Sequence, residues 1–138
     1  MWLTLVELVS VAFAQCTKKD TDMTDAYWHK LDVLVTGATL VIDRPSGSAH
    51  PRYHDTIYPM DYGYLHGTTG GDGEAVDAWR GTEADDTLTG VVCTVDLNKR
   101  DVEVKLLLGC TAAEQQTVLQ FHTGGAAGAI LIPRPSPS

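Results

Sequence analysis

Short runs of apolar residues, broken by turn-forming residues, dominate the pattern of the chain. Residues 88–95 are apolar and rich in β-branched side chains, and residues 101–108 begin with a strict alternation of polar and apolar positions. Residues 96–100 between them are polar apart from Leu97. Two such runs joined by a short polar turn predict an antiparallel hairpin. In its second strand Asp101, Glu103 and Lys105 share one face, because side chains alternate with period two.

The same pattern predicts further strands at residues 31–35, 38–43, 57–58, 62–65, 76–79 and 129–132. Prolines, glycine and serines at residues 44–51 predict a loop. The spacing of Thr111 and Glu114 is that of a capping box and predicts a helix to His122, while Asp25 can cap a shorter one. These elements predict an α+β, mainly β fold with a C-terminal helix and a short N-terminal helix. Many short strands favour a small OB-like barrel.

The two ends of the chain differ from the middle. We treat residues 1–24 as an N-terminal extension or linker, 25–132 as the folded domain, and 133–138 as a disordered tail. Residues 2–14 are mostly apolar, and Ala12-x-Ala14 resembles a signal-peptidase site. Glu7 interrupts this run and no basic residue precedes it, so export is the less favoured alternative. We expect a cytoplasmic protein in which this end is either a short helix or an extension before a working chain that begins near Met23.

Composition narrows the function classes. The chain has 138 residues, enough for one domain with a core, and a formal net charge of −8. This charge argues against nucleic acid or a membrane as the main partner and leaves a small-molecule substrate. The three cysteines have no zinc-site or disulfide spacing. Tryptophans on the surface of a small barrel would favour a homo-oligomer.

Three carboxylates, Asp72, Glu74 and Asp77, follow a glycine-rich turn. Crowded carboxylates repel one another unless a cation neutralises them, and oxygen ligands of this kind suit Mg²⁺, with Mn²⁺ as a substitute. The alternative is a solvated acidic turn. A second acidic group, Asp96, Asp101 and Glu103, flanks the predicted hairpin. If the hairpin lies beside the first group, the carboxylates and nearby cations would suit a metal–phosphate complex.

These residues carry a resemblance. Residues 58–64 read Tyr-Pro-Met-Asp-Tyr-Gly-Tyr, and after seven more residues 72–77 read Asp-Gly-Glu-Ala-Val-Asp. This resembles the signature of the soluble (family I) inorganic pyrophosphatases, Y-P-x-N-Y-G-Y/F followed by D-G-D-P-x-D. The resemblance implies a closed five-stranded barrel that hydrolyses inorganic pyrophosphate to two phosphates with Mg²⁺.

The resemblance also implies residue roles. The metal ligands would be Asp72, Asp77 and Asp101, with Asp96 as a further ligand and Asp43 in the place of an acidic residue of an earlier strand. Glu74 would polarise the attacking water, and Tyr62, Lys105 and Arg52 would hold phosphate oxygens.

Two departures from the family pattern limit this prediction. Glu74 is longer than the family's aspartate, and a displacement of about 1 Å at a catalytic group can cost on the order of a hundredfold in rate. Lys105 lies two positions later than the lysine of the pattern. The alternatives are a barrel that binds metal or phosphate without turnover, and a hydrolase of another small diphosphate.

Overall fold

The computed structural model describes residues 22–136 and divides into two compact units, Met1–Val33 and Leu34–Ser138. We describe each unit by itself. The N-terminal residues 1–21, which include the predicted signal-like segment, and residues 137–138 lie outside the described part. Within residues 22–136 no helix is both long and apolar enough to cross a membrane.

The first described element is a helix at residues 22–36. It includes residues 31–35, so the strand predicted there is wrong. The less exposed positions of this segment are Trp28, Leu31, Asp32 and Val35, the i, i+3, i+4, i+7 spacing of one helix face. The valines of the segment suggested a strand, but an established helix adds each further residue at little cost.

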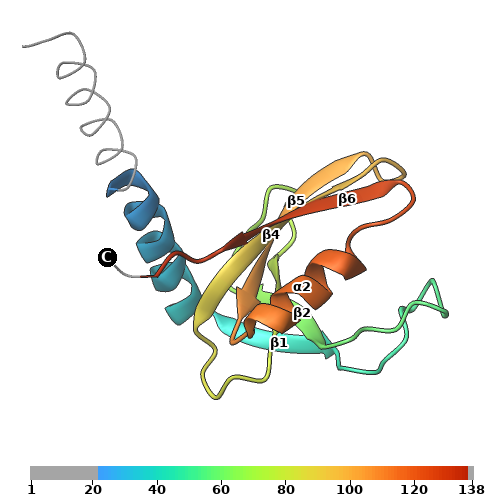
Figure 1. Cartoon of the computed structure of the whole chain (residues 1–138), viewed down its shortest axis with the longest axis horizontal. Coiled ribbons are helices and arrows are strands. Elements are labelled where there is room, and N and C mark those ends of the chain that lie inside the picture. The colour runs from blue at the N-terminus through green and yellow to red at the C-terminus, as the bar shows by residue number, and fades with distance from the viewer. Residues whose placement is uncertain (1–21, 137–138) are drawn as a thin grey trace, which may run out of the picture. The chain divides into compact units, whose positions relative to one another are not determined.

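The second unit is built on a six-stranded mixed sheet (Figure 1). Its strands are β1 (Thr39–Arg44), β2 (Asp61–His66), β3 (Val76–Arg80), β4 (Leu88–Asp96), β5 (Asp101–Leu108) and β6 (Ala127–Pro133). Their order is β1-β2-β3-β5-β4-β6, and only β3 and β5 pair in parallel among the described strands.

The mainly β, α+β prediction is confirmed, and the sheet has six strands where the resemblance implies a five-stranded barrel. The strand predicted at residues 57–58 is wrong, since Ile57 forms only an isolated bridge with Ala49. In residues 22–136 no pairing of β1 with β6 closes the sheet. At the C-terminal end, the residue after β6 is anchored, since the Arg134 amide donates to the Thr89 carbonyl at 2.9 Å.

The predicted hairpin is present as β4 and β5. Asp96 pairs with Asp101 at its end, and Val92 pairs with Lys105 further along. The Asp96 carboxylate accepts hydrogen bonds from the backbone amides of Asn98 (2.9 Å) and Lys99 (3.1 Å). Asp96 therefore stabilises the turn through its own side chain, as aspartate commonly does.

The predicted C-terminal helix is also present, as α2 (Ala112–Phe121). Thr111 caps it, and Thr111 and Glu114 form both hydrogen bonds of the capping box. The helix packs against β4 and β6 and covers a core cluster (Figure 1). The buried members of this cluster are Tyr58, Met60, Trp79, Val92, Leu107, Cys110 and Val118.

Two of the tryptophans are buried and not on the surface, where the sequence led us to expect tryptophans that favour self-association. Trp28 is 4% exposed and Trp79 is fully buried, so neither supplies the exposed tryptophan from which self-association was expected. Cys93 and Cys110 are free thiols, while Cys16 lies outside the described residues. Burial raises the pKa of the Cys110 thiol to about 12, so this cysteine is a core residue rather than a nucleophile.

A glycine allows two strands to approach closely beside the predicted tyrosine motif. A Cβ atom added at Gly63 would lie 1.8 Å from the carbonyl oxygen of Val41. Gly63 pairs with Ile42 on one side and with Ala78 on the other. The absence of a side chain at this position therefore lets β1 lie against β2. The preceding residue, Tyr62, packs against the core cluster.

Candidate active site

A buried lysine lies at the centre of the candidate site. The Lys105 ammonium group donates to the Asp77 carboxylate at 2.9 Å, to the Glu103 carboxylate at 2.7 Å and to the Tyr62 hydroxyl at 3.0 Å. The Tyr62 hydroxyl in turn donates to the same Asp77 oxygen at 2.7 Å. We call these four residues the lysine cluster. An ammonium group has three protons, and these three contacts give each proton an acceptor.

Strand register places the members of this cluster together. β3 runs parallel to β5 with Ala78 opposite Leu106, so the preceding residues Asp77 and Lys105 are neighbours across the two strands. β2 pairs with β3 on its other side and supplies Tyr62. Glu103 lies two positions before Lys105 on the same face of β5. β2 and β3 therefore contribute one polar group each, and β5 contributes two.

The cluster is shielded from water and strongly polarised. The Lys105 side chain is 7% exposed, against 33% for Asp77 and 24% for Glu103. Burial by itself would lower the pKa of Lys105, but the Tyr62 hydroxyl and the carboxylates hold it above its usual value. Burial has the opposite effect on Tyr62 and raises the pKa of its hydroxyl, because it disfavours the phenolate anion. At neutral pH the site therefore holds a charged ammonium group beside a neutral phenol.

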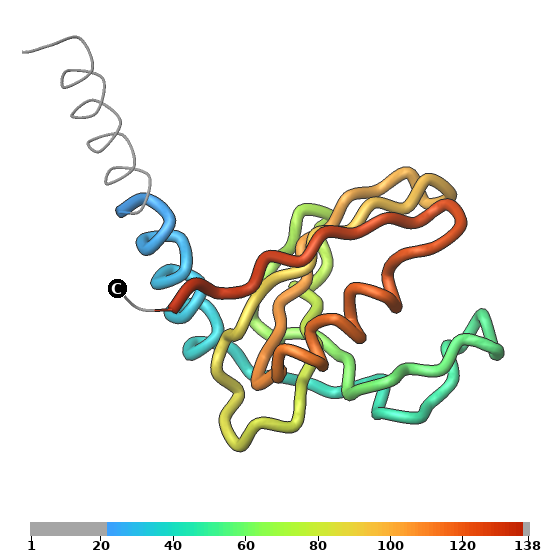
Figure 2. The backbone as a smooth tube through the Cα atoms, viewed as in Figure 1, coloured from blue at the N-terminus to red at the C-terminus, as the bar shows by residue number. Residues whose placement is uncertain are grey.

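A cavity of about 310 Å³ opens beside the lysine cluster. One side comes from the β4–β5 hairpin, and the other from the loop before β2 and from the end of α2. Figure 2 shows the hairpin turn and this loop at the same end of the unit. The lining residues are His50, Tyr53, Thr56, Tyr58, Tyr62, Thr94, Val95, Asp96, Asn98, Lys99, Asp101, Glu103, Lys105, Phe121, His122 and Ala127.

Five predicted site residues lie in or beside this cavity. Tyr62, Lys105, Asp96 and Asp101 line it, and Asp77 adjoins it through its hydrogen bonds to Tyr62 and Lys105. The pairing of β3 with β5 thus brings the hairpin beside Asp77, the last residue of the first acidic group.

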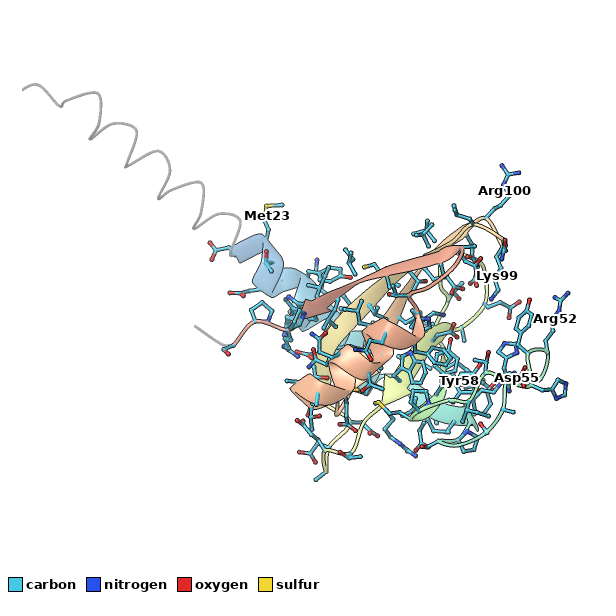
Figure 3. The ribbon with its side chains drawn as sticks, turned by 45° about the vertical axis from the view of Figure 1, so that its right-hand side comes forward. Met23, Arg52, Asp55, Tyr58, Lys99 and Arg100 are labelled. Carbon is cyan, nitrogen blue, oxygen red and sulfur yellow. The ribbon has the colours of Figure 1, made fainter. Side chains whose placement is uncertain are left out.

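The other four predicted residues lie elsewhere. Asp72 and Glu74 are exposed in a turn between β2 and β3, where the Asp72 carboxylate accepts the Glu74 backbone amide at 3.0 Å. Asp43 is exposed and pairs with Arg44 at 3.5 Å. Arg52 is exposed at the outer end of the loop before β2 (Figure 3). Its guanidinium lies over the Tyr53 ring.

Glu103 takes a more central place than the sequence assigned to it. It was counted in the second acidic group but given no site role, whereas its carboxylate makes the shortest contact of Lys105 in the cluster. Glu103 and Lys105 stand two positions apart on one face of the predicted strand. That spacing, which puts a carboxylate beside the candidate lysine, was the signal that could have found Glu103.

His122 was also missed as part of the site. Its Nε2 accepts a hydrogen bond from the Trp79 indole at 3.0 Å, so this nitrogen carries no proton. Burial and the nearby Lys105 charge lower the pKa of His122 to about 4. It therefore stays neutral near pH 7, and its position at the end of α2 fixes one corner of the cavity.

The described residues do not assemble a complete metal centre from protein groups alone. No group of three or more histidine, cysteine, aspartate or glutamate side chains in residues 22–136 is placed to hold a metal ion. Asp77 and Glu103 do contact one nitrogen atom between them, so their oxygens lie close together. Two carboxylates completed by substrate phosphates and water are a usual Mg²⁺ environment.

Comparison with known proteins bears on the fold of the chain. No family model and no curated protein matches the chain. Among solved structures, the chain is similar to an inorganic pyrophosphatase from Neisseria gonorrhoeae, with 19% identity, a TM-score of 0.50, and coverage of 64% of this chain and 77% of that one. An inorganic pyrophosphatase from Helicobacter pylori gives 16% identity, a TM-score of 0.47, and coverage of 68% and 81%. By its likeness to the first of these structures, the fold resembles that of an inorganic pyrophosphatase.

Proposed function

We propose that this protein hydrolyses inorganic pyrophosphate to two phosphates in the cavity beside Lys105, with Mg²⁺. The observation that carries the proposal is the buried ammonium group of Lys105, held by Tyr62, Asp77 and Glu103 at the cavity. The pyrophosphatase-like fold supports it. A fixed cation in a site shielded from water stabilises charge on a phosphate more strongly than a solvated one.

The charge of the cavity explains why the substrate would enter with a cation. Among the described residues that line it, Asp96, Asp101 and Glu103 oppose two ammonium groups, those of Lys99 and Lys105. Asp77 adds another negative charge beside them. A free pyrophosphate anion would be repelled by this balance, whereas a magnesium–pyrophosphate complex would not.

Asp77 and Glu103 are the residues that would hold Mg²⁺, since their oxygens already lie together around one cation. When bound, the ion would neutralise phosphate charge and lower the pKa of a coordinated water. As Asp77 and Glu103 turn to the ion, Lys105 would exchange one of these carboxylate contacts for a phosphate oxygen. The Tyr62 hydroxyl would keep the ammonium group and Asp77 in place. Lys99 lies on the hairpin turn (Figure 3) and lines the cavity, where it would meet the second phosphate.

The reaction consumes one water molecule. The water oxygen forms a bond to one phosphorus atom, and the bond from that phosphorus to the bridging oxygen breaks. A carboxylate at the lysine cluster accepts the water proton, which then passes to the departing phosphate. Glu103 would take this role through its second oxygen, since the contact to Lys105 uses Oε2.

One observation favours the second candidate, a barrel that binds metal and phosphate without turnover. Glu74, which the resemblance makes the residue that polarises water, is exposed in a turn and does not line the cavity. Binding needs the lysine cluster alone, whereas hydrolysis also needs a group that accepts the proton of the attacking water.

Phosphate release from pyrophosphate separates the two candidates. The full chain is assayed with Mg²⁺, with Mn²⁺ and with EDTA, beside Asp77→Asn and the control Asp86→Asn, an exposed carboxylate outside the cavity. We expect metal-dependent release that Asp77→Asn lowers on the order of a hundredfold and Asp86→Asn leaves unchanged. Calorimetric binding of magnesium–pyrophosphate without any release would instead establish the binding barrel.

A further inference from the structure

The cavity has two chemically different sides. The hairpin side carries the charged groups, among them Asp101, Lys99 and Glu103. The opposite side is aromatic and comes from the loop before β2, from β2 itself and from the end of α2. Its rings are those of His50, Tyr53, Tyr58, Tyr62, Phe121 and His122. Pyrophosphate is small and fully polar, so it has no use for an aromatic side.

Four of these rings form a continuous series from the lysine cluster to the outside. Tyr62 stacks on Tyr58, with ring centres 5.4 Å apart and planes 25° apart. Tyr58 stacks on His50 at 6.2 Å and 11°. His50 meets Tyr53 at 5.0 Å and 39°. One end of the series is thus bonded to Lys105 through the Tyr62 hydroxyl, and the other reaches the exposed loop.

The outer two rings are not part of the core. Tyr58 belongs to the core cluster and Tyr62 packs against it, so core packing explains both aromatic residues. Tyr53 is 55% exposed, so core packing does not explain an aromatic residue at this position. An exposed large aromatic side chain beside a cavity is a frequent feature of ligand-binding surfaces.

The loop nevertheless holds the outer rings in place. The Nδ1 atom of His50 accepts the backbone amides of Arg52 at 3.0 Å and of Tyr53 at 3.1 Å. The pKa of His50 is lowered by partial burial and by the nearby charges of Arg44, Lys99 and Arg52. His50 is therefore a neutral ring whose remaining ring nitrogen bears a proton. A bridge between Ala49 and Ile57 closes the base of the loop.

The size and the remaining lining fit a larger ligand than pyrophosphate. At about 310 Å³ the cavity reaches the range of sites that hold small organic molecules. Thr56, Thr94 and Asn98 add uncharged hydrogen-bonding groups to its lining. Such groups suit the hydroxyls of a sugar, between a charged end and an aromatic end.

We infer that the cavity accepts a nucleoside diphosphate, with its phosphates at Lys105 and its base against His50 and Tyr53. This inference rests on the proposed function, because it uses the same phosphate end of the cavity. In hydrolysis the water oxygen would bond to the terminal phosphorus, and the bond from that phosphorus to the bridging oxygen would break. The products are a nucleoside monophosphate and inorganic phosphate, with one water proton kept on the phosphate and the other released to solvent.

Calorimetry with ADP and with pyrophosphate, each with excess Mg²⁺, tests this inference on the full chain. The test variant is Tyr53→Leu, and the control is Tyr27→Leu, a 49% exposed tyrosine of the N-terminal helix. We expect the wild type to bind ADP at least tenfold more tightly than pyrophosphate. Since stacking of a base on one aromatic ring is worth about 1–3 kcal/mol, Tyr53→Leu should lower this ratio about tenfold, and Tyr27→Leu should leave it unchanged.

Phosphate release from the two substrates is measured in parallel, and the results separate this inference from the proposed function. Metal-dependent release from pyrophosphate, with ADP bound no more tightly than pyrophosphate, overturns the inference and leaves the proposed function intact. An equal loss for both ligands in Tyr53→Leu also overturns it. If Tyr53→Leu weakens ADP binding selectively but neither substrate releases phosphate, the result supports the inferred ligand and overturns the proposed hydrolysis.

Discussion

The turn at residues 70–74 and the lysine cluster contain the same kinds of acidic residue in opposite environments. In the turn, Asp72 and Glu74 are exposed, and their hydrogen bond serves the local backbone. In the cluster, Asp77 and Glu103 share a buried ammonium group across two strands. The comparison shows that sequence proximity to Asp77 does not define the site, since pairing between strands selects which carboxylates meet Lys105.

The largest effect should come from removing the charge at the centre of the cluster. Lys105→Met leaves two carboxylates close together without their cation, and we expect a loss of about 3 kcal/mol in the free energy of unfolding. Lys99→Met, at an exposed lysine of the same unit, should change it by less than about 0.5 kcal/mol. Urea unfolding of both variants measures the difference, and equal stabilities would show that the cluster is not a structural centre.

A pH dependence of stability should come from the neighbour of the cluster, His122. Its folded-state pKa of about 4 lies below the ordinary value of 6.5. Between these two pH values the unfolded chain binds more protons, so stability should fall as the pH falls from 6.5 to 4. We expect His122 to account for about 2 kcal/mol of this loss, after allowing for partial exposure.

Unfolding of the wild type and of His122→Gln across this range isolates the contribution. Glutamine can still accept a hydrogen bond from the Trp79 indole N–H, but its side chain does not titrate. The variant should therefore lose less stability than the wild type on acidification, and parallel curves would contradict the assignment.

A smaller effect is expected for Glu74, and it is measured as enzyme activity, in comparison with Asp77 of the lysine cluster. Because this side chain lies outside the cavity, Glu74→Gln should lower phosphate release from pyrophosphate less than about fivefold, or about 1 kcal/mol of activation free energy. Asp77→Asn in the same assay serves as the reference. A loss as large as that of Asp77→Asn would mean that the turn moves into the site during the reaction.

The smallest effect is expected at Asp72. Asparagine keeps a side-chain oxygen that can accept the Glu74 amide, so Asp72→Asn should change unfolding free energy by less than about 0.5 kcal/mol. Its calorimetric affinity for magnesium–pyrophosphate should match that of the wild type. A weaker affinity would show that Asp72 is a metal ligand, as the resemblance implies.

Local patterns sufficed for the elements whose signals lie within a few residues. The alternation in residues 101–108 and the polar turn before it predicted the hairpin, and the pairing of Thr111 with Glu114 predicted the helix α2. The segment 31–35 failed because its valines favour a strand while its position at the end of a helix decides its structure. Its stripe at helical spacing was present in the sequence.

The sequence by itself determined the chemistry available to this protein: a lysine with nearby carboxylates, a tyrosine–glycine–tyrosine motif, and the spacing that resembles the pyrophosphatase signature. The tertiary structure alone decided which of these groups meet. Asp77 reaches Lys105 because β3 pairs in parallel with β5, a contact between residues 28 positions apart. Likewise, only the fold carries the rings of a loop to the same cavity, since pairing between distant strands depends on the whole core and not on local sequence.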